Sequence, residues 1–150
     1  MKHPYHKQQN DYFCGPSAVQ MILGAHGIKK TQARLGKMMG SVPFRGTRRR
    51  IMAKPLRANG FVVRMKAHAS IDELDRLIRD GWHIIVNYIE LGDDIGHFAV
   101  VTKVTPTHLV MHDPWHGANY RISRKTFLPR WMGGNRRKDQ ARWYLAAKPR

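Results

Sequence analysis

The sequence has one cysteine, few acidic residues and no long apolar segment. Of its 150 residues only 10 are Asp or Glu, against 27 Lys and Arg, so the formal net charge is +17. A single cysteine cannot form an internal disulfide, so the fold cannot depend on oxidation. No apolar run approaches the roughly 20 residues of a membrane-spanning helix, and the polar, aromatic amino terminus lacks the apolar core of a signal peptide. We therefore expect no membrane span and, by default, a cytoplasmic location, with secretion left open.

The few acidic residues are unevenly distributed along the chain. None lies between Tyr12 and Ile71, and most lie between Asp72 and Asp94. A surface rich in Lys and Arg attracts polyanions such as nucleic acid or an acidic protein. One predicted helical region carries a cluster of basic residues, namely Arg45, Arg48, Arg49, Arg50, Lys54 and Arg57. This cluster indicates either a polyanion-binding face or a basic surface that is simply solvated.

The length and the 42% hydrophobic share are typical of one folded domain, which we expect to span residues 1–150. Hydrophobic spacing and end signals predict helices over residues 14–27, 31–39, 47–60 and 71–81. Thr31 can cap the second helix, Pro55 should kink or shorten the third, and Ser70 with Glu73 forms a capping box before the fourth.

The second half of the chain changes to a β-rich pattern. The strand candidates there cover residues 82–90, 97–104, 109–114, 119–122 and 142–147, with a short helix over residues 123–131. One further strand candidate, residues 61–67, precedes the fourth helix. Amino-terminal helices followed by an antiparallel sheet describe an α+β domain.

The lone cysteine, Cys14, stands where the first predicted helix begins, in the stretch Cys-Gly-Pro-Ser. A thiolate at a helix amino terminus is stabilised by the helix dipole and by free backbone N–H groups, which lower its pKa. A free cysteine is also commonly a small buried hydrophobic residue. The position alone leaves both interpretations open.

Two further residues could complete a nucleophilic site with Cys14. His97 opens an apolar strand after Gly96, and Asp113 ends the next strand before Pro114. A hairpin centred near Thr105 places both side chains at the same open end, where a carboxylate can orient an imidazole. Each also has a structural interpretation, His97 as an edge histidine and Asp113 as an Asp-Pro turn residue.

The amide of Gln8, six residues before Cys14, is a candidate partner of the Cys14 backbone N–H in an oxyanion hole. The adjacent Gln9 could be mistaken for it.

Taken together, these residues resemble the papain-like cysteine peptidases, and most of all the bacteriocin-processing, double-glycine leader peptidases and their soluble relatives. The order is Gln, six residues, Cys-Gly, then a distant His, sixteen residues, Asp-Pro. The segments that carry the resemblance are Pro4-Tyr5, Gln8, Cys14-Gly15-Pro16-Ser17, Gly27, Gly46-Thr47, Gly60-Phe61, Gly96-His97-Phe98 and Asp113-Pro114-Trp115.

The resemblance implies a papain-like fold and a role for each of four residues. Cys14 attacks the scissile carbonyl, His97 takes the thiol proton and later protonates the leaving amine, and Asp113 holds the imidazole. Gln8 and the Cys14 backbone N–H bind the oxyanion. The implied partner is a peptide or protein substrate, and the Cys–His pair needs no metal or other cofactor.

Three alternatives remain open at this stage. The same thiol chemistry serves an acyltransferase or amidase, and a polyanion-binding module could retain a degenerate site. A metal site is the third, because neutral imidazoles and a carboxylate bind zinc and His97, His108, His112, Asp113 and His116 lie within twenty residues.

The loops that flank the predicted cleft carry candidate substrate contacts. Asp93 and Asp94 precede His97, while Trp115 and His116 follow Asp113. We expect the two aspartates to favour basic substrates. Near the amino terminus, His3 and His6 are expected on the surface, with His6 an alternative cleft residue close to Gln8.

Overall fold

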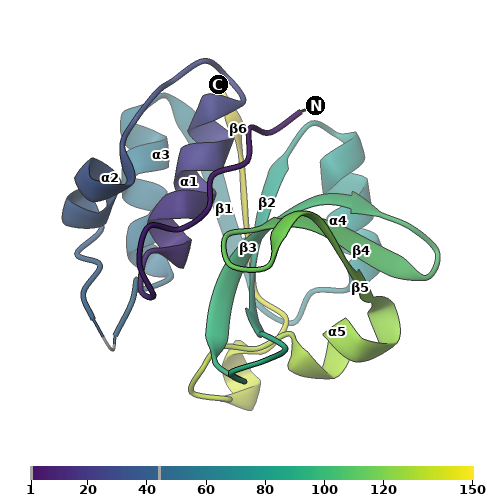
Figure 1. Cartoon of the computed structure of the whole chain (residues 1–150). Helices are drawn as coiled ribbons and strands as arrows, with labels where there is room; N and C mark the ends of the chain where they lie inside the picture. Colours follow the sequence, from purple (N-terminus) through teal and green to yellow (C-terminus); the bar gives the residue numbers. More distant parts are fainter. Residues whose placement is uncertain (1, 44) are drawn as a thin grey trace.

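The computed structural model describes residues 2–43 and 45–150 and arranges them as an α+β fold (Figure 1). The helices are α1 (Cys14–Gly24), α2 (Gln32–Met38), α3 (Ala53–Ala58), α4 (Ile71–Arg79) and α5 (Arg124–Arg130), with 3₁₀ turns η1 (Arg50–Met52) and η2 (Lys138–Gln140). The strands are β1 (Phe61–Lys66), β2 (His83–Ile89), β3 (Gly96–Val104), β4 (His108–Asp113), β5 (Gly117–Ser123) and β6 (Tyr144–Pro149). This order confirms the predicted α+β arrangement.

The strands form one antiparallel sheet in the order β1-β6-β2-β3-β4-β5. The final strand, β6, therefore lies between β1 and β2, so that the carboxy-terminal segment joins the two parts of the sheet. Strands β2 to β5 follow one another as a meander. Strand β2 is buried along its whole length, which explains its nearly continuous apolar sequence.

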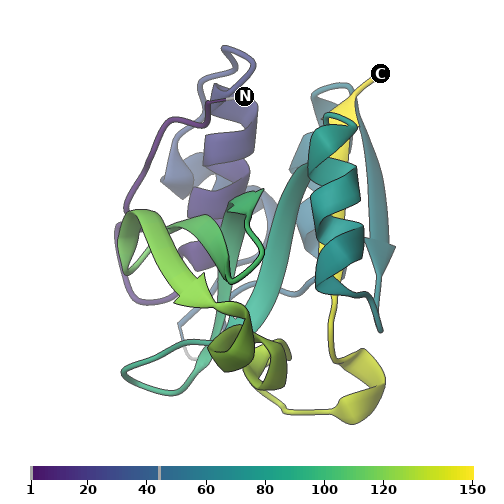
Figure 2. The same cartoon turned by 90° about the vertical axis from the view of Figure 1, so that its right-hand side faces the viewer.

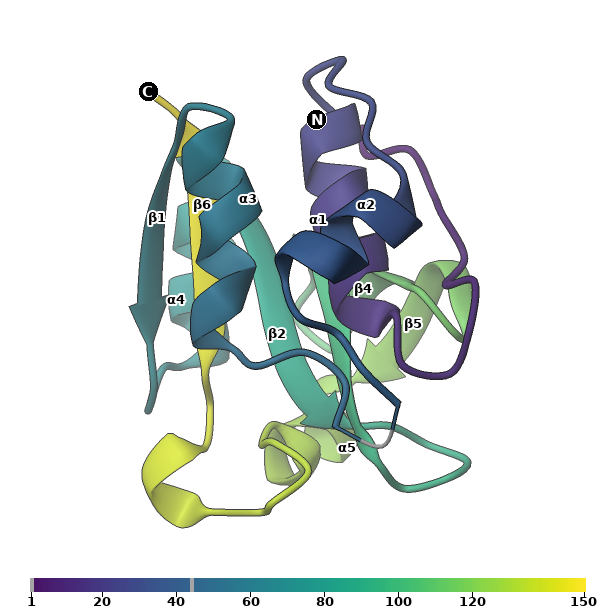
Figure 3. The ribbon, with the colours of Figure 1, turned by 90° about the vertical axis from the view of Figure 1, so that its left-hand side faces the viewer.

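Helices cover both faces of the sheet. Figure 3 shows α1, α2 and α3 on one face, and Figure 2 shows α4 on the opposite face. Each face has its own apolar core: Ile22, Leu56 and Val100 belong to the cluster under α1–α3, whereas Leu74, Tyr88 and Phe127 belong to the cluster under α4 and α5. The sheet is therefore a fixed support for α1, which packs against β3.

The helix ends follow from their side chains, with one departure from the prediction. Thr31 caps α2 by accepting the Arg34 N–H, and Ser70 caps α4 by accepting the Glu73 N–H. The Glu73 carboxylate does not complete the predicted capping box, because it binds Lys66 and Tyr144 instead.

The third predicted helix begins later than expected. The chain from Thr47 to Arg49 is not α-helical, and α3 starts only at Ala53, after the turn η1. Pro55 lies in the first turn of α3, where its missing N–H has no intrahelical partner to lose. Among the described residues, no helix is both long and apolar enough to cross a membrane.

Candidate active site

Cys14 is the first residue of α1. The preceding residue, Phe13, provides no side-chain cap. Gly15 lets the helix start approach Thr47, since a Cβ at Gly15 would lie 2.7 Å from the Thr47 hydroxyl oxygen. The tight contact explains why glycine follows the cysteine. The thiol thus sits where backbone N–H groups and the helix dipole favour a thiolate.

His97 and Asp113 come together at the end of the β3–β4 hairpin. The Nε2 of His97 lies 2.7 Å from Oδ1 of Asp113, and both side chains are almost fully buried. Val104 pairs with Leu109, so the hairpin is centred between residues 106 and 107 rather than at Thr105, and the register shifts between Val101 and Lys103. The two residues share the open end as predicted, although by a different register.

The contact with Asp113 leaves Nδ1 as the ring nitrogen of His97 that is available to Cys14. Burial raises the pKa of the Cys14 thiol, but its hydrogen bond with His97 and the charge of that ring lower it more. Backbone N–H groups of Phe98 and Gly15 act in the same direction, and the net pKa lies below the ordinary value.

The imidazole is shifted in the opposite sense. Burial lowers the pKa of His97, but hydrogen bonds and charge from Asp113 and Cys14 raise it to about 10. A lowered thiol pKa beside a raised imidazole pKa favours the thiolate–imidazolium pair over the neutral pair.

Asp113 is kept ionised by the hydrogen bonds it accepts. Oδ1 accepts the backbone N–H groups of Trp115 and His116, each at 2.9 Å, besides the His97 ring. Oδ2 accepts the hydroxyl of Tyr88. Burial raises the pKa of Asp113, but these bonds and the charge of His97 lower it below its ordinary value. The carboxylate is therefore a fixed, charged acceptor for the imidazole.

Gln8 reaches the same place from the amino-terminal segment (residues 2–13). It is 6% exposed, and its backbone N–H donates to the Pro114 carbonyl at 3.0 Å. Among the described residues, its Nε2 donates only to the Asn10 carbonyl, at 2.7 Å, so a second amide hydrogen is free, and its Oε1 is buried without a hydrogen-bond partner. Gln9, the neighbour with which it could be confused, is exposed.

The structure brings Gln8, Cys14 and His97 together as lining residues of one cleft. The remaining lining residues are Asp11, Glu90, Asp93, Ile95, Gly96 and Trp115. Both predicted loops therefore contribute to the cleft, but only Asp93 of the two aspartates does so. Asp94 instead pairs with Arg130 and Arg136, each at 2.9 Å.

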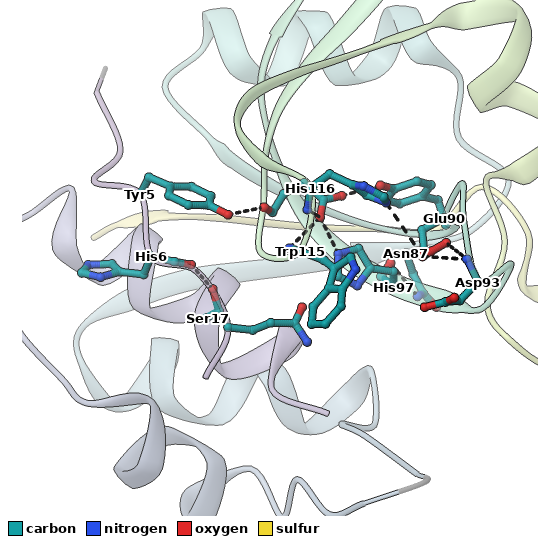
Figure 4. Close-up of polar contacts among 12 residues, drawn as sticks. Tyr5, His6, Ser17, Asn87, Glu90, Asp93, His97, Trp115 and His116 are labelled. Carbon is teal, nitrogen blue, oxygen red and sulfur yellow. Dashed lines mark hydrogen bonds and ion pairs between the residues drawn. The ribbon is translucent and has the colours of Figure 1, made fainter. Parts of the chain in front are cut away.

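Several supporting residues were not anticipated from the sequence. Figure 4 shows Asn87 and Glu90 close to His97, and both come from β2 or its end. Asn87 donates from Nδ2 to the His97 carbonyl at 3.1 Å and accepts from Nε of Arg49 at 2.9 Å. Tyr88 holds Asp113. The available signal was their polarity: Asn87 interrupts the apolar run of β2, and Glu90 follows directly after this strand.

The histidines considered as a metal cluster are engaged separately. His108 lies at the far end of the hairpin and binds the Thr107 hydroxyl, whereas His112 donates to the His3 carbonyl and accepts from the Asn119 N–H. Among the described residues, no group of three potential ligands could hold a metal ion.

Two expectations for the amino-terminal histidines need correction. His3 is partly buried rather than on the surface, and its Nε2 lies 2.6 Å from Nδ1 of His83, whose Nε2 lies 2.7 Å from Nε2 of His26. Burial lowers the pKa of His3 to about 4 and that of His83 to about 3. His6 does not line the cleft; Figure 4 shows its ring pointing away from His97.

The predicted basic cluster is divided by the structure. Arg49 is turned inward and donates to Asn87 and to the Gln140 carbonyl, with its guanidinium 5.0 Å from the centre of the Trp143 ring. Burial lowers the pKa of Arg49. The other members, Arg45, Arg48, Arg50, Lys54 and Arg57, are exposed.

Comparison of the chain with models of known protein families matches it to one family. The model described as the Peptidase C39 family matches residues 2–134. A curated relative, the lactococcin transport/processing ATP-binding protein LcnC-like of Lactococcus lactis subsp. lactis (strain IL1403), is 25% identical over 134 residues, which are 88% of this chain. The match covers only 18% of that relative's length.

Solved structures share the fold at low sequence identity. The peptidase domain of Streptococcus ComA, a bifunctional ABC transporter, superposes with a TM-score of 0.76 at 21% identity, covering 99% of this chain and all of that one. A double glycine motif protease from an AMS/PCAT transporter, in complex with its leader peptide, gives 0.77 at 18% identity, covering 99% and 93%. A C39-like peptidase from Bacillus anthracis gives 0.73 at 14%, covering 99% and 96%.

Proposed function

Because the chain belongs to the peptidase C39 family of cysteine peptidases, we propose that it hydrolyses peptide bonds with Cys14 as nucleophile and His97 as base and acid. The observation that carries this proposal is that His97 lines one cleft with Cys14 while its Nε2 lies 2.7 Å from Oδ1 of Asp113. Such a pair activates a thiol without a metal ion.

The reaction proceeds in two displacements. The Cys14 thiolate attacks the scissile carbonyl carbon, and the imidazolium of His97 then gives its proton to the leaving amine as the C–N bond breaks. A thioester between Cys14 and the acyl part remains. Water then attacks this thioester while His97 takes a proton from it, and the C–S bond breaks to release the acid and restore the thiol.

Negative charge develops on the carbonyl oxygen in both displacements. The backbone N–H of Cys14, at the start of α1, and the second amide hydrogen of Gln8 can both donate to this oxygen. These are the two positions from which the resemblance to the family expects the oxyanion donors. Loss of one oxyanion donor typically lowers kcat by about 10²- to 10³-fold. We expect a loss of this size for Gln8→Ala, with substrate binding changed far less.

The site and the relatives support a proposal for the substrate class. A thiol at the edge of an open cleft suits an extended peptide, and the double glycine motif protease of similar fold was solved with its leader peptide. We therefore propose a peptide or protein substrate, with a leader peptide that ends in two glycines as the first to test. Product masses will separate hydrolysis from acyl transfer, because added amines become incorporated only in the second case.

A thiol-reactive peptide probe tests the catalytic pair. Incubation at neutral pH followed by mass spectrometry should show rapid modification of wild-type protein, little of His97→Ala and none of Cys14→Ser. The conservative change Asp139→Asn, at an exposed carboxylate that pairs with Arg137, serves as the control and should react like wild type. Equal modification of wild type and His97→Ala would contradict the proposed pair.

A second property rests on charge. Lys29, Arg34, Lys37, Arg48 and Lys54 are exposed on the α1–α3 side and form no ion pair with any described residue. We propose that this basic side binds nucleic acid independently of catalysis. Binding of a 20-base-pair duplex should weaken steeply with salt and persist in Cys14→Ala. It should drop in the double variant Arg48→Ala, Lys54→Ala; binding that ignores salt would contradict the proposal.

We also propose that residues 1–150 act as a single domain, since both apolar cores pack on the same sheet. Urea unfolding followed by circular dichroism and by tryptophan fluorescence should then give coincident transitions.

A further inference from the structure

The cleft beside Cys14 has the opposite charge to the rest of the molecule. Although the chain carries +17, the cleft is lined by the carboxylates of Asp11, Glu90 and Asp93. None of the described residues that line it is Lys or Arg. The thiolate and the imidazolium of the proposed catalytic pair offset each other, so the three carboxylates set the net charge of the cleft. Carboxylates that line a concave site focus the local potential. At physiological ionic strength the Debye length is about 8 Å, so the distant surface cations do not cancel this potential within the cleft.

The way the loop after β2 is held keeps the carboxylates of Glu90 and Asp93 in the cleft. Glu90 is 2% exposed, and its carboxylate accepts the backbone N–H groups of Asp93 and Asp94 at 3.1 to 3.3 Å. The two nearby arginines, Arg130 and Arg136, pair with Asp94. Asp93 forms no ion pair with any described residue and remains available in the cleft.

Two uncharged groups of the same cleft also suit a cationic side chain. The Oε1 of Gln8 is buried in this lining and has no hydrogen-bond partner among the described residues, so it can accept from a donor that enters the cleft. Trp115, 46% exposed, already has the Lys7 ammonium 5.8 Å from the centre of its ring. Ammonium and guanidinium groups offer only donors and also bind to tryptophan faces.

Figure 4 shows how these groups are placed relative to the imidazole. Glu90 and Asp93 lie to one side of His97 in this view, and Trp115 lines the same cleft. A side chain that enters between them comes from a substrate residue close to the reacting carbonyl, because Cys14 lines the same cleft.

We propose that Asp11, Glu90 and Asp93 form an acidic subsite that selects peptides with Lys or Arg close to the scissile bond. This inference rests on the proposed peptidase function and names its substrate preference. A Glu in the same substrate position meets three carboxylates and is rejected, whereas a neutral residue is tolerated. The preference weakens with added salt, because Asp11 and Asp93 are exposed.

A positional library of internally quenched peptides tests the subsite. One of the three positions on either side of the central bond is fixed as Lys, Gln or Glu, and the remaining positions are randomised, so no particular core sequence is assumed. At one position at least, kcat/KM for Lys should exceed that for Gln by about five- to tenfold, as two exposed ion pairs allow. Glu should be cleaved more slowly than Gln.

The variant Asp11→Asn, Asp93→Asn should lower the ratio of kcat/KM for Lys peptides to kcat/KM for Gln peptides to about twofold or less. The control Asp72→Asn, Asp139→Asn removes the same charge from exposed positions outside the cleft and should keep the preference. Cleavage without a Lys preference at any position, or a preference that survives in the cleft variant, overturns the subsite alone. Cleavage of no library peptide by wild type overturns the subsite, and if the thiol-reactive probe also fails to modify Cys14, the proposed function is overturned with it.

Discussion

Replacing Asp113 by Asn should largely remove the thiolate of Cys14 at neutral pH. Asn keeps Oδ1 as the acceptor for the His97 ring and for the two backbone N–H groups that Asp113 now binds. It removes the negative charge and turns the other oxygen into a donor, so the Tyr88 hydroxyl must accept rather than donate. The geometry of the loop is therefore largely kept while the electrostatic support of the imidazolium is lost.

The magnitude follows from the pKa of His97. Its value of about 10, against an ordinary 6.5, corresponds to roughly 5 kcal/mol in favour of the protonated ring. An opposite charge in direct contact accounts for about one to three pH units of such a rise. Without it, the ratio of thiolate–imidazolium to thiol–imidazole should fall by about 10- to 1000-fold.

Because Cys14 is the only cysteine, its thiolate can be followed by absorbance at 240 nm as a difference from Cys14→Ser, between pH 4 and 9. Wild type should show the thiolate signal at pH 7, and Asp113→Asn should show little until more alkaline pH. Asp139→Asn should match wild type. A thiolate signal in Asp113→Asn equal to that of wild type at pH 7 would refute the assigned role of the carboxylate.

Two other predictions concern the free energy of unfolding. Burial lowers the pKa of His83 to about 3. Between this value and the ordinary 6.5, the unfolded chain binds a proton at His83 that the folded chain does not. The contribution of His83 to the free energy of unfolding is therefore full above pH 6.5 and falls as the pH drops toward 3. In urea unfolding, the wild-type free energy should fall by up to roughly 1.4 kcal/mol per pH unit more steeply than that of His83→Gln in this range; parallel slopes would contradict this. Arg49→Lys keeps the charge but cannot hold both Asn87 and the Gln140 carbonyl, so unfolding free energy should drop by about 1–3 kcal/mol, measured by urea, with the Arg48→Lys control unchanged.

The helices, strands and candidate site residues were accessible from the sequence because local signals reported them. A capping threonine or serine, a glycine after a helix and a run of β-branched residues each act within a few positions. Even the position of His97 and Asp113 at the same open end of the β3–β4 hairpin followed from one assumed hairpin. What the pattern could not give was the register, since the shift between Val101 and Lys103 has no local signature.

The contacts between distant segments could not be read from the sequence for the same reason. Arg49 looked like one more basic residue of a charged run, yet it is drawn inward by Asn87, which lies 38 positions later. Asp93 and Asp94 were equivalent neighbours in the sequence, and only the positions of Arg130 and Arg136 distinguish them. Such differences depend on tertiary packing rather than on residue type.

Asp113 links the two halves of the proposed machinery through different atoms. Its carboxylate holds the His97 ring, while its main-chain carbonyl accepts the Tyr5 hydroxyl at 2.7 Å, and the next carbonyl, that of Pro114, accepts the Gln8 N–H. The amino-terminal segment that carries Gln8, the proposed oxyanion donor, is therefore attached to the same turn that orients His97, the proposed base. Because one turn fixes both, a displacement of the end of β4 shifts the base and the oxyanion donor together. Tyr5→Phe should accordingly slow turnover through the position of Gln8 and leave the Cys14 thiolate signal intact, a separation that Asp113→Asn cannot produce.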